Sequence, residues 1–71
     1  MINSNKIKGR MVELGITQKD IAKELQIAPP TVSQKINNVR PMDLNEAEIL
    51  ARMLRIGAED FATYFFAGTV A

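Results

Sequence analysis

The chain has 71 residues, 46% of them hydrophobic, which suits one small domain with a modest core. It contains no cysteine and no histidine, which excludes disulfides, metal sites built from these residues, and thiol or imidazole catalysis. The net charge is only +1, but seven of the nine basic residues lie in residues 1–40 and five of the eight acidic residues lie in residues 41–71. This asymmetry fits a basic face for phosphates and fits an ordinary solvated surface equally well.

A first helix is expected over about residues 5–14. Its apolar residues recur on one helical face, at Ile7, Met11 and Leu14. Ser4 is suited to cap its start, and Gly15 stands where a left-handed residue ends many helices. Lys6 and Arg10 on this helix are either phosphate ligands or plain surface charges.

A second helix is expected to begin at Thr17, with Asp20 three residues later as a short version of the capping-box acid. Residues 26–27 form a tight turn. A third helix then starts at one of two consecutive prolines and runs over about residues 29–37, because proline fits the first turn of a helix.

The composition of residues 37–41 is typical of a loop. Asp43 and Glu46 repeat the capping pattern, which predicts a fourth helix over about residues 44–55 that ends at Gly57. Acidic residues then favour the start of a short fifth helix over residues 59–66, and residues 67–71 are expected to be a flexible tail.

Four aromatic side chains on the fifth helix exceed what so small a core accommodates. Phe61 and Phe65 are expected to be internal. Tyr64, Phe66 and Val70 are then candidates for a partner surface. That surface would bind a second copy of the chain or another protein, and the alternative is that these residues simply pack within the domain. The expected core is Ile7, Met11, Leu14, Ile16, Ile21, Ala22, Leu25, Ile27, Val32, Ile36, Ile49, Leu50, Leu54, Ile56 and Phe61.

The spacing within residues 18–37 suits two helices that cross closely through a turn of about three residues. Ala22 supplies the small residue that such a crossing requires, and it is expected to meet Val32 of the third helix. Together with other motifs, this segment resembles the family of phage repressors and Cro proteins over about residues 7–61. The motifs are Gly15-Ile16-Thr17-Gln18, Ile21-Ala22, Leu25-Gln26-Ile27, Thr31-Val32-Ser33-Gln34, Arg40-Pro41 and Leu54-Arg55-Ile56-Gly57.

The resemblance implies an all-α, lambda-repressor-like bundle of five helices in a single helix-turn-helix domain (residues 1–71, core 5–66), whose third helix enters the DNA major groove. Many members pair an arginine of the first helix with a glutamate of the third. The matching positions here, Met11 and Ile36, are both apolar, so neither charge is stranded. Gln26 replaces the usual turn glycine, which costs on the order of 1 kcal/mol if its φ is positive.

The resemblance also implies which residues contact DNA. The base-reading candidates are Gln34, Ser33, Thr31, Lys35 and Pro30. Of these, Gln34 is the first choice because glutamine pairs with adenine through two hydrogen bonds, whereas proline offers no donor. A solvated helix face remains the alternative for this set, and Thr31 alternatively satisfies helix-start N–H groups. The phosphate-contacting candidates are Gln18, Lys19, Asn37, Asn38 and Arg40.

Two functions remain open at this stage. The first is a sequence-specific transcriptional regulator of phage or prophage type that binds double-stranded operator DNA, acting as a dimer in the bacterial cytoplasm at the nucleoid. The second is a modulator or antirepressor that binds another helix-turn-helix repressor and blocks its DNA-reading surface. In either case the chain is not expected to be an enzyme, to bind a metal, cofactor or small-molecule substrate, or to enter a membrane.

Overall fold

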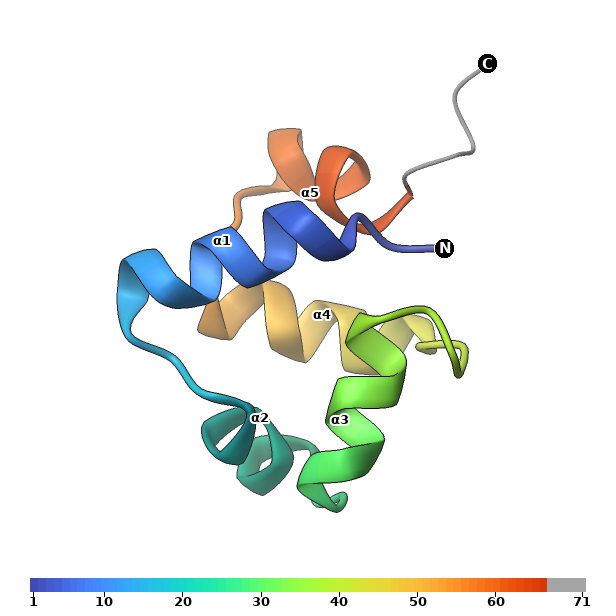
Figure 1. Cartoon of the computed structure of the whole chain (residues 1–71). Coiled ribbons are helices and arrows are strands. Elements are labelled where there is room, and N and C mark those ends of the chain that lie inside the picture. The colour runs from blue at the N-terminus through green and yellow to red at the C-terminus, as the bar shows by residue number, and fades with distance from the viewer. Residues whose placement is uncertain (67–71) are drawn as a thin grey trace.

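The computed structural model describes residues 1–66, and within this range the chain forms five helices and no strand. The helices are α1 (Ser4–Leu14), α2 (Gln18–Leu25), α3 (Pro29–Ile36), α4 (Leu44–Met53) and α5 (Ala58–Phe65). In Figure 1, α5 lies beside α1 at one end of the molecule, and the α2–α3 pair lies at the opposite end. The predicted all-α fold with its helix-turn-helix unit is therefore confirmed, whereas the tail predicted over residues 67–71 lies outside the described residues.

The turn between α2 and α3 depends on one residue in the left-handed region. Gln26 has a φ of 57°, so the strain foreseen for a non-glycine residue is present. The N–H of Ile27 donates to the carbonyl of Ala22 at 3.1 Å, which closes the turn. Ala22 and Val32, the two residues expected at the crossing, are both buried, and α2 packs against α3.

One apolar cluster connects all five helices. It consists of Ile2, Ile7, Met11, Ile21, Ala22, Val32, Ile36, Ala47, Leu50, Ala51, Leu54 and Phe65. Seven residues expected in the core are only half-buried. Five of them pack against this cluster, namely Ile16, Leu25, Ile27, Ile56 and Phe61, and the other two are Leu14 and Ile49. Ile2 was not predicted to contribute, because it precedes the helical pattern, yet only 7% of its surface is exposed. The charge pair missing from α1 and α3 is replaced by apolar packing, since Met11 and Ile36 are both buried in this cluster.

The start of α1 differs from the prediction. Asn3, not Ser4, is the N-cap, and its side chain accepts a hydrogen bond from the N–H of Lys6. Ser4 is the first helical residue, and its hydroxyl instead donates to the carbonyl of Ile36 at the end of α3. The sequence did not reveal this choice, because asparagine and serine cap helices about equally well.

The end of α4 also differs from the prediction. The helix stops at Met53, two residues early, and Arg55 rather than Gly57 takes the left-handed conformation, with a φ of 54°. Gly57 instead has an extended backbone and is the N-cap of α5. The helix ends because the N–H of Arg55 donates to the carbonyl of Arg52 at 3.2 Å and that of Ile56 to the carbonyl of Ala51 at 2.9 Å. The Nε of Arg10 on α1 donates to the carbonyl of Leu54 at 2.9 Å and satisfies this group at the helix end. Arg10 is therefore a structural cap.

The tight crossing of α2 and α3 predicts the effect of a larger residue at Ala22. Ala22→Leu overpacks a site that is 4% exposed, so we expect a loss of roughly 1–3 kcal/mol in the free energy of unfolding. Thermal denaturation measures this as a melting temperature lower by about 4–8 °C per kcal/mol. The control is Ala62→Leu, the same substitution at an exposed position of α5. Equal melting temperatures for the two variants would contradict the assigned crossing.

Candidate nucleic-acid interface

The N-terminus of α2 presents free backbone N–H groups. Thr17 and Asp20 form a reciprocal capping box, in which each side chain accepts a hydrogen bond from the backbone N–H of the other. The next two N–H groups, of Gln18 and Lys19, have no partner within residues 1–66 and point out of the helix end. Backbone donors at a helix N-terminus suit a phosphate group, and the helix dipole favours the negative charge.

The Asp20 carboxylate is held in its ionised form. The Thr17 N–H donates to it at 2.9 Å and lowers the pKa of Asp20 below 3.8, and the Thr17 hydroxyl and Lys23 act in the same direction. The capping box is therefore complete at neutral pH, and it fixes the orientation of the two free N–H groups.

The candidate base-reading residues lie along the whole length of α3, about 12 Å. Gln34 and Pro30 are exposed, whereas Thr31 and Ser33 are half-buried. The Gln34 side chain makes no hydrogen bond within residues 1–66, while its backbone carbonyl accepts from the N–H groups of Val39 and Arg40 at 2.8 and 3.2 Å. Gln34 is thus anchored through its backbone and leaves its amide available to a ligand.

Lys35 has a partner inside the protein. Its ammonium lies 2.6 Å from both carboxylate oxygens of Glu46 on α4, and the side chains are 15% and 13% exposed. Glu46 also accepts the N–H of Asp43 and completes the capping box of α4. The predicted Asp43–Glu46 capping pattern is present, but the contact that occupies Lys35 was not foreseen, because nothing in the sequence places α3 against the start of α4.

The remaining candidates for phosphate contacts lie in the loop after α3 and differ in their surroundings. Arg40 is exposed, and its guanidinium makes no hydrogen bond within residues 1–66. Asn37 is exposed too, although its side chain accepts from Lys8 and donates to the carbonyl of Ser33.

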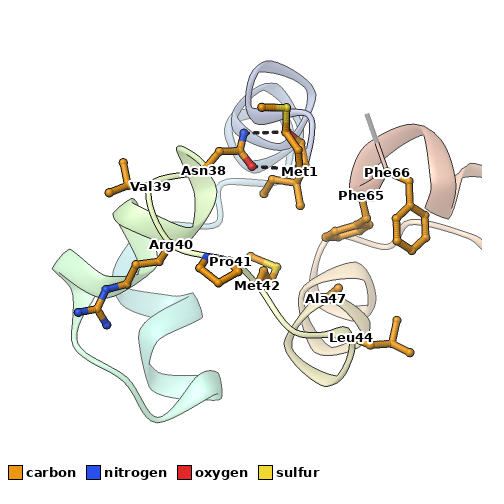
Figure 2. Close-up of a pocket in the computed structure, with 11 residues that line it drawn as sticks. Met1, Asn38, Val39, Arg40, Pro41, Met42, Leu44, Ala47, Phe65 and Phe66 are labelled. Carbon is orange, nitrogen blue, oxygen red and sulfur yellow. Dashed lines mark hydrogen bonds between the residues drawn. The ribbon is translucent and has the colours of Figure 1, made fainter. Parts of the chain in front are cut away.

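Asn38 has a φ of 62° and clamps the N-terminal segment instead. Its Oδ1 accepts from the N–H of Ile2 at 2.9 Å, and its Nδ2 donates to the carbonyl of Ile2 at 3.0 Å (Figure 2). The Nδ2 also donates to the Ser4 hydroxyl at 3.1 Å. The signal in the sequence was the pair Asn37-Asn38, since asparagine tolerates the left-handed region. The partner of Asn38, 36 residues away, could not be read from the sequence.

The aromatic residues of α5 are placed differently from one another. Phe65 is buried as expected, whereas Phe61 is half-buried and its ring is in edge contact with that of Phe65 at 4.6 Å. Tyr64 is half-buried too, with the ammonium of Lys6 above its ring at 5.3 Å, so Lys6 covers an aromatic face. Phe66 is 44% exposed. Val70, the third candidate for a partner surface, lies outside the described residues.

Phe65 and Phe66 border a hollow of about 420 Å³, which we call the terminal groove. Figure 2 shows it between the end of α5, the N-terminus, the α3–α4 loop and the start of α4. Its lining is mainly apolar, from Met1, Ile2, Asn38, Val39, Arg40, Pro41, Met42, Leu44, Ala47, Phe65 and Phe66. The sequence suggested an apolar surface on α5 and the tail that follows it, so the contribution of Leu44 was missed.

Other kinds of site are not seen in the part of the chain that the structure describes. Residues 1–66 bring together no group of three or more acidic side chains that could hold a metal ion. No helix within them is long and apolar enough to cross a membrane.

A short α2, a tight turn and an exposed α3 define the chain as a helix-turn-helix protein. The family model for helix-turn-helix proteins matches residues 7–61, which is most of the chain. The chain therefore belongs to this family, in the type represented by Cro and phage repressors, whose members are DNA-binding regulators rather than enzymes. Neither the curated proteins nor the solved structures contain a significant match.

The capping box of α2 predicts a pH dependence of stability. The lowered pKa of Asp20 means that its contribution is fully present above the unfolded-state pKa of 3.8 and is lost as the pH falls through the lower folded-state pKa. Asp20→Asn is therefore expected to be less stable than the parent at neutral pH, with a difference that shrinks well below pH 3.8. Urea denaturation at neutral pH and well below pH 3.8 measures this difference in the free energy of unfolding.

Asp60→Asn is the matched control, because Asp60 is an exposed acid in the first turn of α5 without a capping box. A difference between Asp20→Asn and the parent that stays constant with pH would contradict the role given to the carboxylate.

Proposed function

We propose that the chain is a transcriptional regulator of phage or prophage type that binds an operator in the bacterial cytoplasm as a dimer. The observation that carries this proposal is the available hydrogen-bonding surface of the helix-turn-helix unit. Gln34 offers a free side-chain amide on α3, and the first N–H groups of α2 point outward without a partner in residues 1–66. Phosphate contacts position a protein on DNA and base contacts specify the sequence, and this surface carries groups for both.

In this proposal Gln34 reads a base, and Ser33 and Thr31 are secondary readers. Gln18 and Lys19 at the start of α2 contact one phosphate, while Arg40 and Asn37 contact another beyond the end of α3. Lys35 and Asn38 have mainly structural roles. Lys35 pairs with Glu46, and Asn38 holds the N-terminal segment. Arg40 points away from Phe65 and Phe66 in Figure 2, so it remains accessible to DNA when the terminal groove is occupied.

The dimer is proposed to form through the terminal groove, with a second copy of the chain as its occupant. A single module makes few base contacts, so specificity usually comes from two half-sites related by a two-fold axis. Four large apolar side chains are exposed at the groove, from Met1, Val39, Leu44 and Phe66. Such a patch is smaller than the ~800 Å² per partner of a stable interface, so we expect a weak dimer that DNA completes.

A second function is supported by a specific observation. Apart from Gln34, α3 offers few polar groups for base reading, because two prolines begin it and Lys35 is paired with Glu46. A modulator that binds another helix-turn-helix repressor through the terminal groove needs no base readers. The two functions differ in one measurement, which is whether the purified protein enriches specific duplexes from a random library of double-stranded DNA.

DNA binding is tested with a duplex enriched in that selection. Gln34→Ala is expected to weaken binding by about 1–3 kcal/mol and to relax the preference at one base pair. Arg40→Ala is expected to weaken binding to all sequences and to reduce the slope of log affinity against log salt by about one unit. Lys35→Met is expected to leave that slope nearly unchanged, since its ammonium neutralises Glu46. Fluorescence anisotropy over a range of salt concentrations measures all three.

The control is Arg52→Ala, which removes the same charge from an exposed position on α4. An equal loss for Arg40→Ala and Arg52→Ala would mean that overall charge, and not the placement of Arg40, determines the affinity. Failure to enrich any duplex would contradict operator binding and favour the modulator.

The dimer is tested by sedimentation equilibrium at micromolar concentrations, alone and on a duplex with two half-sites. Leu44 is 60% exposed at the start of α4, where an acidic side chain favours the helix, so Leu44→Glu alters the groove without breaking the fold. We expect this variant to be monomeric at concentrations where the parent dimerises. Val12→Glu, at an 82% exposed position of α1, is expected to dimerise like the parent. A parent that is monomeric in both settings, or equal behaviour of the two variants, would contradict this interface.

A further inference from the structure

The first exposed residues of α3 form an apolar surface. Ala28 is the N-cap of the helix, and Pro29 and Pro30 are its first two residues. All three are exposed, and none has a polar atom in its side chain. Pro30 precedes Gln34 by four residues, about one helical turn, so these two exposed residues lie on the same face of α3.

The first four residues of α3, 29–32, offer no free backbone N–H group. Pro29 and Pro30 have no N–H group, and the N–H groups of Thr31 and Val32 both donate to the carbonyl of Ala28, at 2.9 and 3.2 Å. The start of α3 is therefore unlike that of α2, where two N–H groups are unpartnered within residues 1–66. These four residues therefore donate no hydrogen bond from their backbone to an anion or to an acceptor on a base edge.

The chemistry of the major groove limits what such a surface can distinguish. Thymine presents an acceptor and a methyl group at C5, whereas cytosine presents a donor and no methyl group. The apolar side chains of Ala28, Pro29 and Pro30 make no hydrogen bond to these groups, but they gain free energy when they remove an apolar methyl group from water. The C5-methyl group is thus the one feature of a pyrimidine that this surface can select.

We propose that Pro29 and Pro30 are specificity-determining residues that select a C5-methylated pyrimidine in each half-site. This inference rests on the proposed operator binding. Two sources supply the same chemistry, thymine in unmodified DNA and 5-methylcytosine in methylated DNA. Because the prolines contact the methyl group and not the hydrogen-bonding edge, they treat thymine and 5-methylcytosine alike and reject uracil and cytosine alike.

The experiment begins with selection by the parent protein from a random duplex library that contains thymine. Each thymine of the enriched half-site is then replaced singly by uracil, which removes only the methyl group. Each is also replaced by 5-methylcytosine or by cytosine, with the complementary base changed to guanine. At one or two positions, uracil is expected to lower the affinity by about fourfold for each methyl group that loses its buried contact. At those positions, 5-methylcytosine is expected to bind more tightly than cytosine by a similar factor.

The protein side of the test uses the double variant Pro29→Ser/Pro30→Ser. Serine is accepted at the start of a helix, and it exchanges the apolar surface for hydroxyl and N–H donors. The double variant is expected to bind the thymine and uracil duplexes equally. Gln34→Ala is the control, because it is expected to weaken binding while it keeps the preference for thymine over uracil. The uracil comparison with the parent protein needs no variant, so it tests the methyl selection even if the double variant does not fold. The single variant Pro30→Ser then tests the role of the proline nearest Gln34 and is expected to reduce the preference for thymine.

The outcomes separate the two proposals. An enriched duplex in which no uracil replacement matters would overturn the methyl selection and leave operator binding intact. A preference for thymine that persists in a folded double variant would also overturn the role of the prolines. If no duplex is enriched at all, operator binding itself fails, and the methyl selection fails with it. A preference for thymine over uracil without one for 5-methylcytosine over cytosine would show that the contact depends on the whole base and would contradict the proposed chemistry.

Discussion

The placement of α3 is the constraint on which the rest of the molecule depends. A helix of eight residues is not stable by itself in water, so its position must come from its contacts. At its start, the turn through Gln26 joins it to α2. At its end, the Ser4 hydroxyl accepts a hydrogen bond from Asn38 and donates one to the carbonyl of Ile36. Between these points, Val32 and Ile36 are buried, so α3 has little freedom to rotate about its axis, and Pro30 and Gln34 are held on its exposed side.

The sequence predicted those parts of the fold that depend on neighbours along the chain. The capping boxes at Thr17 and Asp43 and the turn at Gln26 each involve residues within a few positions of one another. Apart from the N-cap of α1, the main errors concern contacts between distant segments. Arg10 of α1 donates to the carbonyl of Leu54 at the end of α4, and Asn38 holds Ile2 at a separation of 36 residues. For the candidate interface, the helices were therefore predictable, whereas the partners of Lys35 and Asn38 were not, because only the tertiary structure brings Glu46 and the N-terminus to them.

The N-terminal clamp connects the DNA-facing side of the molecule with the terminal groove. Asn38 belongs to the loop that follows α3, and it fixes the backbone of Ile2, whose neighbour Met1 lines the groove. Arg40 lies two residues further along the same loop and points away from Phe65 and Phe66 (Figure 2). One short loop thus shapes both surfaces, so in the proposed dimer a second copy of the chain in the groove would fix the position of Arg40 relative to the other half-site. The proposed weak interface and the proposed DNA binding would then reinforce each other.

The two helix starts of the helix-turn-helix unit differ in what they can contact. The capping box of α2 uses side chains to satisfy part of the helix end and leaves two N–H groups outward, which suits the negative charge of a phosphate. The first four residues of α3 leave no free N–H group. Two of them are prolines, and the N–H groups of the next two donate to the Ala28 carbonyl. An α3 with donors at this point would compete for phosphates and gain affinity without sequence preference. In the proposed DNA complex, the donor-free start of α3 would leave nonspecific attraction to α2 and the loop, and α3 would contribute mainly selectivity through Gln34 and the apolar surface before it.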